Sequence, residues 1–167
     1  MRLVLGFLAL MPGVAKADSA DGELVTLLAQ CLVANQDFPE NCQNLPYRNC
    51  LETQLTVAPN PELASERCWH QEIFVWGEIE TQAKERLKRA LPDEEWRAIE
   101  LAMEARGNLT AEETAFPFLS VRNADRTVRP MLTRGVALSV RHRALLVLSY
   151  EELLRNGAFV FQGEADN

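Results

Sequence analysis

Apolar residues recur at helical spacing along most of this chain. In the first periodic segment, within residues 18–37, they fall three and four positions apart: Leu24, Leu27, Leu28 and Cys31. That spacing places them on one face of an amphipathic helix. We expect the helix to end before Phe38-Pro39, because proline cannot donate the backbone hydrogen bond that continues a helix.

A second and longer amphipathic helix is predicted from Pro61 to Leu91. Asn60 precedes it as a capping residue, and proline suits the first turn. Its basic residues cluster in Lys84–Arg89, where cations favour the negative end of the helix dipole. Its apolar positions are spaced for one buried face: Trp69, Ile73, Trp76, Ala83 and Leu87. We interpret the tryptophans as packing residues, and expect Glu78, Glu80 and Glu85 to lie on a solvated face.

Two further helices follow. Leu91-Pro92 separates the long helix from one whose buried face carries Trp96, Ile99 and Met103 and which ends at Gly107. Thr110 and Glu113 form a capping-box pattern that opens the next segment. The last helix is predicted from Pro130 to Arg155, closed by Asn156-Gly157. Its apolar run Ala144–Leu148 is also compatible with a buried strand, but its charged flanks favour a helix.

The remaining segment, residues 39–60, is rich in proline and asparagine, with one short helix expected near Tyr47–Glu52. Strand-like alternation is not convincing anywhere in the chain. The pattern predicts an all-α fold: a small disulfide-stapled helical bundle of four to six helices with a loop-rich connector. We expect a single domain over residues 18–157 and a frayed tail over residues 158–167.

The first 17 residues have the order of features of a secretory signal peptide. Arg2 precedes an apolar run, and Ala15-Lys16-Ala17 is a small-x-small cleavage site. The apolar run is shorter than the roughly 20 residues that span a bilayer, so a membrane anchor is the weaker interpretation. Cleavage after Ala17 would send the chain to the periplasm or outside the cell, with no membrane span in the mature protein.

Charge narrows the classes of partner. The 167 residues carry 17 basic and 24 acidic side chains, a net charge of −7, and removing residues 1–17 would leave −9. An acidic chain repels a phosphate backbone, so we expect no nucleic-acid partner and favour a basic one. Arginines crowd the last third of the chain. They either pair with the acidic helices on folding or leave an acidic face free for a cationic partner.

All four cysteines precede residue 70: Cys31, Cys42, Cys50 and Cys68. An even number of cysteines after a signal peptide indicates disulfides formed in an oxidising compartment. Four cysteines allow three pairings. We favour Cys31–Cys42 and Cys50–Cys68 because neighbouring cysteines close the shortest loops. A zinc site using His70 is the alternative, but no C-x-x-C pair is present, and we expect neither metal nor cofactor.

No pattern points to catalysis. The two histidines, His70 and His142, stand without a nucleophile signature, and the chain has neither a G-x-S-x-G elbow nor a glycine-rich phosphate loop. Asn108-Leu109-Thr110 matches a glycosylation sequon, but Thr110 is better explained as a helix cap. We therefore expect no catalytic residues and a protein that is not an enzyme.

One constellation resembles a known family. Cys31 and Cys42 at short spacing are followed by Cys68-x-x-x-Glu72-x-x-x-Trp76, and Phe118 to Ala124 stands where the family has a second motif, with Arg122 as its only charged match. This resembles the LprI-like, lysozyme-inhibitor-like domain family, in its secreted alphaproteobacterial form. The resemblance implies a small helical, disulfide-bonded envelope protein, with Glu72, Trp76 and Arg122 as family-motif residues.

These observations lead to one expected function and two alternatives. The first is a non-enzymatic binding protein that holds lysozyme or another basic envelope protein through an acidic face. The second is an envelope structural or stress-related interaction protein with a different partner. The third and most remote is a hydrolase, which would require a carboxyl or histidine with a shifted pKa in a cleft.

Overall fold

The computed structural model describes residues 20–56, 60–106 and 129–157. In these ranges every regular element is a helix and no strand occurs, so the all-α expectation is confirmed. The elements, in chain order, are α1 (Ala20–Ala34), the 3-10 turn η1 (Pro39–Cys42), α2 (Leu45–Gln54), α3 (Pro61–Ala90), a helix at residues 93–106 and α5 (Arg129–Arg155). The apolar run at residues 144–148 lies within α5 and is not a strand.

Several sequence predictions lie outside the described residues. They concern the signal peptide at residues 1–17, the end of the fourth helix at Gly107, the sequon and capping box around Thr110, the motif residue Arg122 and the tail at residues 158–167.

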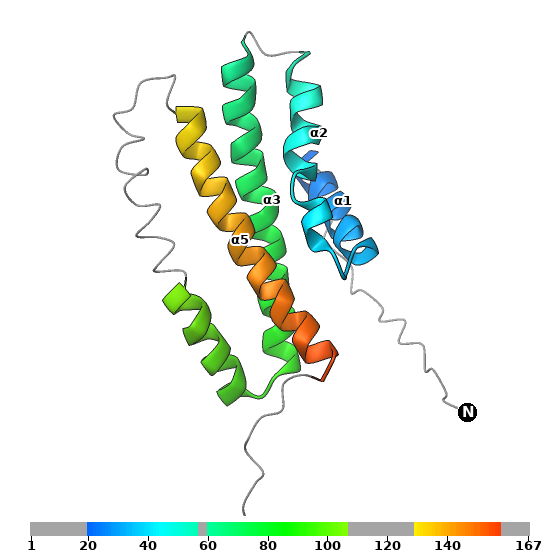
Figure 1. Ribbon diagram of the computed structural model, residues 1–167, viewed down its shortest axis with the longest axis vertical. Coiled ribbons are helices and arrows are strands. Elements are labelled where there is room, and N and C mark those ends of the chain that lie inside the picture. Colours follow the sequence, from blue (N-terminus) through cyan, green and yellow to red (C-terminus); the bar gives the residue numbers. More distant parts are fainter. Residues whose placement is uncertain (1–19, 57–59, 107–128, 158–167) are drawn as a thin grey trace, which may run out of the picture.

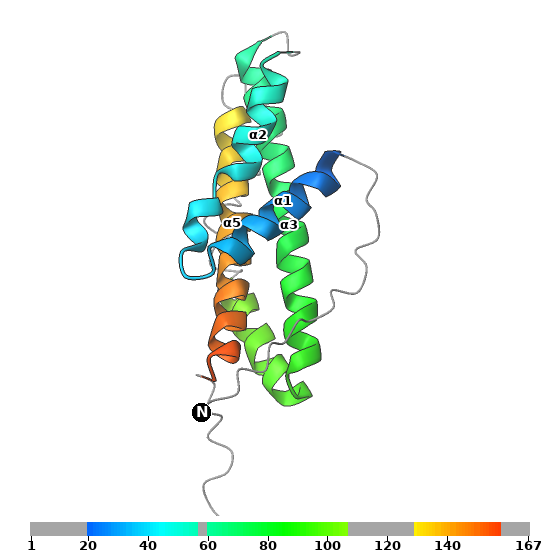
Figure 2. The same ribbon diagram turned by 90° about the vertical axis from the view of Figure 1, so that its right-hand side faces the viewer.

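The long helix α3 is the central rod of the molecule. α5 lies beside it over most of its length and runs in the same direction (Figure 1). α2 runs antiparallel to α3 along its first half, and the helix at residues 93–106 returns beside its second half (Figure 1). α1 crosses α3 obliquely near its middle (Figure 2). Each half of the rod is therefore braced by a different neighbour.

Local sequence signals set both ends of α3. The side chain of Asn60 accepts a hydrogen bond from the backbone N–H of Leu63 at 2.7 Å, and Pro61 occupies the first helical position. At the other end Leu91 has an extended backbone, with Pro92 next in the chain. A capping asparagine satisfies one of the orphan N–H groups of the first turn, which is why the predicted start is also the observed one.

The core consists of two clusters that follow the two halves of the rod. The upper cluster joins α1, α3 and α5 and includes Leu28, Val75, Trp76, Ile79 and Ala144. The lower cluster joins α3, α5 and the helix at residues 93–106 and includes Ala83, Leu87, Ile99, Met103 and Val147. Trp76 and Trp69 are buried and Trp96 is partly buried, as expected of packing residues.

Two disulfides staple the first part of the chain. Cys31–Cys42 joins the end of α1 to η1, and Cys50–Cys68 joins α2 to α3. This is the pairing that the short loops favour. The second disulfide holds α2 along the first half of α3. In this position α2 lies against the buried carboxylate of Glu72.

The expectation that Glu80 is solvated is wrong. Its side chain is only 10% exposed, and its two oxygens lie 2.7 Å from Lys84 Nζ and 3.4 Å from Arg143 Nε, one oxygen to each cation. Two cations, one of them from α5, offset the cost of withdrawing the carboxylate from water. Its neighbours Glu78 and Glu85 are exposed as expected.

Candidate functional site

The two family-motif residues within the described chain meet in a buried polar centre. Glu72 and Trp76, one turn apart on α3, are both fully buried. The Glu72 carboxylate accepts hydrogen bonds from the backbone N–H of Tyr47 at 3.0 Å and from Arg141 Nη1 at 3.2 Å. These donors come from α2 and α5, so one carboxylate joins three helices.

Glu72 also provides the capping hydrogen bond that the start of α2 lacks. Asn44, the N-cap residue of α2, makes no side-chain capping bond, because its Oδ1 accepts from Arg141 at 3.1 Å instead. The same Arg141 nitrogen donates to the backbone oxygen of Gln43 at 2.9 Å. The N–H of Tyr47, which a local cap would normally satisfy, is bonded by the carboxylate of α3. The N-terminus of α2 is therefore capped by a residue distant in sequence.

Burial raises the pKa of Glu72 from 4.5 to about 7. The charge of Arg141 and the N–H of Tyr47 act in the opposite direction, but desolvation is the larger effect. The indole N–H of Trp76 also favours the ionised carboxylate, although no acceptor among the described residues lies within hydrogen-bonding geometry of it. Perturbed carboxyl groups occur at catalytic sites and in structural ion pairs alike. This one is closed off by its three helices, so its direct role here is to join them.

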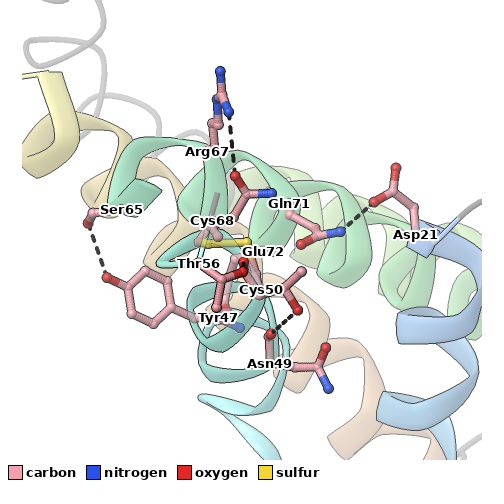
Figure 3. The surroundings of a disulfide bond; sticks show 12 residues. Asp21, Tyr47, Asn49, Cys50, Thr56, Ser65, Arg67, Cys68, Gln71 and Glu72 are labelled. Atoms are coloured by element: carbon pink, nitrogen blue, oxygen red, sulfur yellow. Dashed lines mark hydrogen bonds between the residues drawn. A yellow bond between two sulfur atoms is a disulfide. The ribbon is translucent and has the colours of Figure 1, made fainter. Parts of the chain in front are cut away.

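A stack of side chains closes the same end of the bundle. The Tyr47 ring lies 4.0 Å from that of Trp69, centroid to centroid, and its hydroxyl is 3.0 Å from Ser65 Oγ. The guanidinium of Arg134 lies 5.8 Å from the Trp69 ring centroid. Figure 3 shows Tyr47 and Glu72 beside the Cys50–Cys68 disulfide. The stack fixes α2, α3 and α5 in register around the buried carboxylate.

The other residues considered for catalysis or metal binding do not lie together in the structure. His70 and His142 are both exposed and lie on different helices. Within the described ranges no group of three histidine, cysteine or acidic side chains is placed to hold a metal ion, and no cysteine is free. No helix among them is long and apolar enough to cross a membrane.

The loop between Cys31 and Cys42 is a compact surface feature of the described chain. It joins the end of α1 to η1 and carries Phe38, which is 60% exposed. Asp37 and Glu40, on either side of Phe38-Pro39, are exposed as well. The loop therefore presents an aromatic ring between two carboxylates.

The backbone of this loop is held in place from within. The N–H of Phe38 donates to the oxygen of Asn35 at 3.1 Å, and the N–H of Asn41 donates to the oxygen of Phe38 at 3.0 Å. The Cys31–Cys42 disulfide closes the loop, and Arg155 at the end of α5 donates to Gln36 Oε1 at 2.8 Å. An exposed aromatic side chain thus sits on a preorganised backbone, which lowers the entropy lost on binding.

The loop belongs to an acidic part of the described chain. Residues 20–56 contain five acidic side chains and one basic side chain, Arg48. Four of the five acids are exposed: Glu23, Asp37, Glu40 and Glu52. By contrast Arg141 and Arg143 of α5 pair with glutamates of α3. The sequence left two interpretations of the arginines in the last third of the chain. Pairing with acidic helices on folding is the one that holds for Arg141 and Arg143.

Sequence reasoning treated Phe38-Pro39 only as the end of a helix and did not identify Phe38 as a binding residue. The available signal was an aromatic residue between two acids, inside a short loop closed by two cysteines. Of the motif residues, the structure brings Glu72 and Trp76 together in the core, whereas Arg122 lies outside the described residues.

No protein-family model matches the chain, and neither a curated protein nor a solved structure matches it. The lysozyme-inhibitor-like resemblance therefore stays a prediction carried by the cysteine spacing and the motif residues.

Proposed function

We propose that this chain is a non-enzymatic binding protein of the periplasm or the cell exterior, which docks a basic protein. Its contact surface is the loop closed by Cys31–Cys42 together with the acidic surface of α1 and α2. Lysozyme is the first partner to test, because the motif resemblance points to it and because lysozymes are commonly basic.

The compartment is supported by two independent features. Both disulfides are formed, and such bonds persist in oxidising compartments and are rare in the cytosol. The sequence of residues 1–17 has the features of a secretory signal. Together they favour export over a cytosolic location.

The single observation that carries the proposal is the exposure of Phe38 on a held loop. Leaving a large apolar side chain 60% exposed forgoes the stabilisation that its burial would bring. Binding hot spots are typically aromatic side chains that a partner desolvates fully. Because the loop is already fixed, a partner that covers Phe38 would gain this burial with little ordering cost.

Charge supports a basic partner. Exposed carboxylates around Phe38 would attract a cationic surface and raise the association rate. Such an attraction weakens with salt, since the screening length falls to about 8 Å at physiological ionic strength.

The test is lysozyme turnover of bacterial cell walls, with the purified oxidised protein titrated in at low and at physiological salt. We expect saturable inhibition that weakens with salt. Phe38→Ala should raise the inhibition constant at least about tenfold, which corresponds to about 1.4 kcal/mol of lost binding free energy. Phe74→Ala is the matched control, because Phe74 is also exposed, at 47%, but lies on α3.

Two results would count against the proposal in different ways. Unchanged turnover at large excess of protein would exclude the lysozyme used, and would favour an envelope interaction with a different partner. Inhibition that Phe38→Ala and Phe74→Ala weaken equally would keep lysozyme as the partner but reject the loop as its contact surface.

A further inference from the structure

A single nitrogen atom of Arg141 on α5 connects three acceptors. Its Nη1 donates to the backbone oxygen of Gln43 at 2.9 Å, to Asn44 Oδ1 at 3.1 Å and to Glu72 Oε1 at 3.2 Å. We call Arg141 and these three residues the Arg141 cluster. Among the acceptors only the carboxylate of Glu72 carries a charge, since the others are an amide side chain and a peptide oxygen. The positive charge of Arg141 is therefore balanced within the cluster only while Glu72 is ionised.

Burial makes this balance important. The side chain of Arg141 is 12% exposed and that of Glu72 is 0% exposed. A guanidinium in a protein stays protonated, so it cannot become neutral together with Glu72. When the carboxylate takes up a proton from solvent, a mostly buried cation is left without a counter-ion, which is costly. Arg141 can lower this cost by turning towards water, because it is not fully enclosed. It then gives up its bonds to Gln43 and Asn44.

Among the described residues, Arg141 is the charge that acts on the carboxyl of Glu72. The other groups that bond to this carboxyl or favour its ionised form are neutral: the backbone N–H of Tyr47 on α2 and the indole N–H of Trp76 on α3. The Tyr47 phenol contacts Ser65 instead. Nearby charged or titratable residues of the packed helices are exposed or contact another partner: Asp21, Arg48, His70, Arg134, His142 and Arg143.

The cluster holds residues 43–49, which join the loop closed by Cys31–Cys42 to α2 and which we call the junction. The junction begins directly after one disulfide and ends directly before the other, Cys50–Cys68. Both of its ends are covalently fixed, so noncovalent contacts hold the backbone between them. These contacts include the two bonds from Arg141 and the bond that the N–H of Tyr47 donates to Glu72. Loss of the Arg141 bonds would loosen the junction without detaching α2 from α3.

We propose that proton uptake by Glu72 is a switch that releases Arg141 from the junction and loosens the start of α2. While Glu72 is ionised the junction is held, and when Glu72 is protonated the junction is loose. Protonation also removes the cost of burying a carboxylate, so the bundle as a whole stays folded in acid. The pKa of Glu72, raised to about 7, places the change between about pH 8 and about pH 5.5.

The consequence for binding rests on the proposed function. Gln43 follows Cys42 directly, so the junction continues the loop that carries Phe38. A loose junction adds to the conformational freedom that the loop loses when a basic protein covers Phe38. The docking of that protein should therefore weaken in acid.

The first experiment measures amide hydrogen exchange of the oxidised protein by NMR at about pH 8 and about pH 5.5, with rates corrected for the intrinsic effect of pH. We expect the protection of the Tyr47 and Arg48 amides to fall at least about fivefold in acid, because both belong to the first turn of α2. The protection of amides in the centre of α3 should not fall.

Two variants hold the switch in opposite states. Glu72→Gln removes the charge at every pH, so protection at the start of α2 should be low under both conditions. Asn44→Asp gives Arg141 a second carboxylate at an exposed position, where an aspartate titrates near about 4, so the fall in acid should shrink to less than about twofold. Glu80→Gln is the matched control and should behave as wild type, because Glu80 is also a buried glutamate of α3 but takes its cation from Arg143 of α5.

The histidines need a control of their own, because histidine side chains change charge in the same pH range. His70 and His142 are both exposed. The double variant His70→Asn/His142→Asn should show the same fall in protection as wild type.

The second experiment measures the Kd for lysozyme of wild type and of Asn44→Asp at both pH values. The ratio of the wild-type Kd to the variant Kd should rise at least about threefold in acid, because only the wild type loosens its junction. Comparing this ratio between the two pH values removes the constant effect of the extra negative charge.

Two exchange results would overturn the switch: unchanged protection of the Tyr47 and Arg48 amides in wild type, or a fall in protection that Asn44→Asp does not reduce. A ratio of Kd values that is the same at both pH values would reject the regulation of docking. Absence of lysozyme binding at either pH would count against the proposed function alone, because hydrogen exchange is measured without a partner.

Discussion

Glu72 shows how much one side chain can decide in this molecule. Its carboxylate caps α2 and pairs with Arg141 of α5, so it contributes specific contacts between three helices. Desolvation nevertheless outweighs these contacts and raises its pKa to about 7. A buried ion pair of this kind specifies an arrangement of helices more than it stabilises one.

The raised pKa has a definite consequence for stability. The folded protein binds a proton at Glu72 more tightly than the unfolded chain does, whose glutamate titrates near 4.5. The contribution of this group to the free energy of unfolding is therefore greatest below pH 4.5 and is lost as pH rises through 7. Between these two limits the contribution changes by about 3 kcal/mol, at roughly 1.36 kcal/mol for each unit by which the two pKa values differ.

We predict that Glu72→Gln flattens the pH dependence of stability, because glutamine does not titrate. Urea unfolding measured between pH 4.5 and 8 should show the difference between wild type and variant changing by up to about 3 kcal/mol across this window. Glu78→Gln, an exposed position on the same helix, should retain the wild-type slope. Parallel stability curves for wild type and Glu72→Gln would contradict the prediction.

At the scale of the element, two glycines in helical segments have opposite requirements. Gly77 lies in the middle of α3, and no atom of the described residues lies within 4 Å of where a Cβ would stand. Gly157 follows the end of α5 with a φ of +65°, in the left-handed region that L-residues avoid. Its N–H donates to the backbone oxygen of Leu154 at 3.1 Å and so closes the last turn.

We predict effects of opposite sign for the same substitution at these two positions. Gly77→Ala should stabilise the protein by about 0.5–1 kcal/mol, because alanine loses less backbone freedom on folding and meets no clash. Gly157→Ala should destabilise it by about 1 kcal/mol through its positive φ. Thermal unfolding of the two variants checks both signs. A lower melting temperature for Gly77→Ala would contradict the prediction, because it would mean that the added methyl group is not accommodated.

At the scale of the whole molecule, the disulfides attach the acidic surface to the rod. α1, η1 and α2 form one lateral unit against α3, and both disulfides lie within it or at its border (Figures 1 and 2). Their sequence separations are 11 and 18 residues, for which loop-closure entropy corresponds to about 3 kcal/mol each. The position of the proposed binding loop therefore depends on covalent bonds as well as on packing.

We predict that Cys50→Ser and Cys68→Ser cost similar amounts of stability, about 3 kcal/mol each, since each breaks the same bond. The double variant should cost no more than either single one, because the second change removes nothing further. Denaturant unfolding of the three variants measures this. Losses that add up would show that the two cysteines contribute independently.

Much of the fold could be predicted from the sequence, because the signals that set it are local. Asn60-Pro61 begins α3, Leu91-Pro92 separates it from the next helix, and Asn156-Gly157 closes α5, as capping and backbone preferences require. Apolar periodicity selected most of the buried positions of the helices, but it also placed Leu27 on the apolar face of the first helix, and Leu27 is 38% exposed. Short loop lengths favoured the disulfide pairing that the structure contains.

The candidate sites depend on contacts that no local pattern contains. Glu80 is buried and Glu78 is exposed, although both are glutamates on one helix, because the oxygens of Glu80 meet a cation from α5, far along the chain. Only the tertiary structure placed Phe38 at the surface on a fixed loop. Sequence thus determined the helices and their apolar faces through short-range backbone and packing preferences. Burial of charge and exposure of apolar side chains were decided by which helices meet.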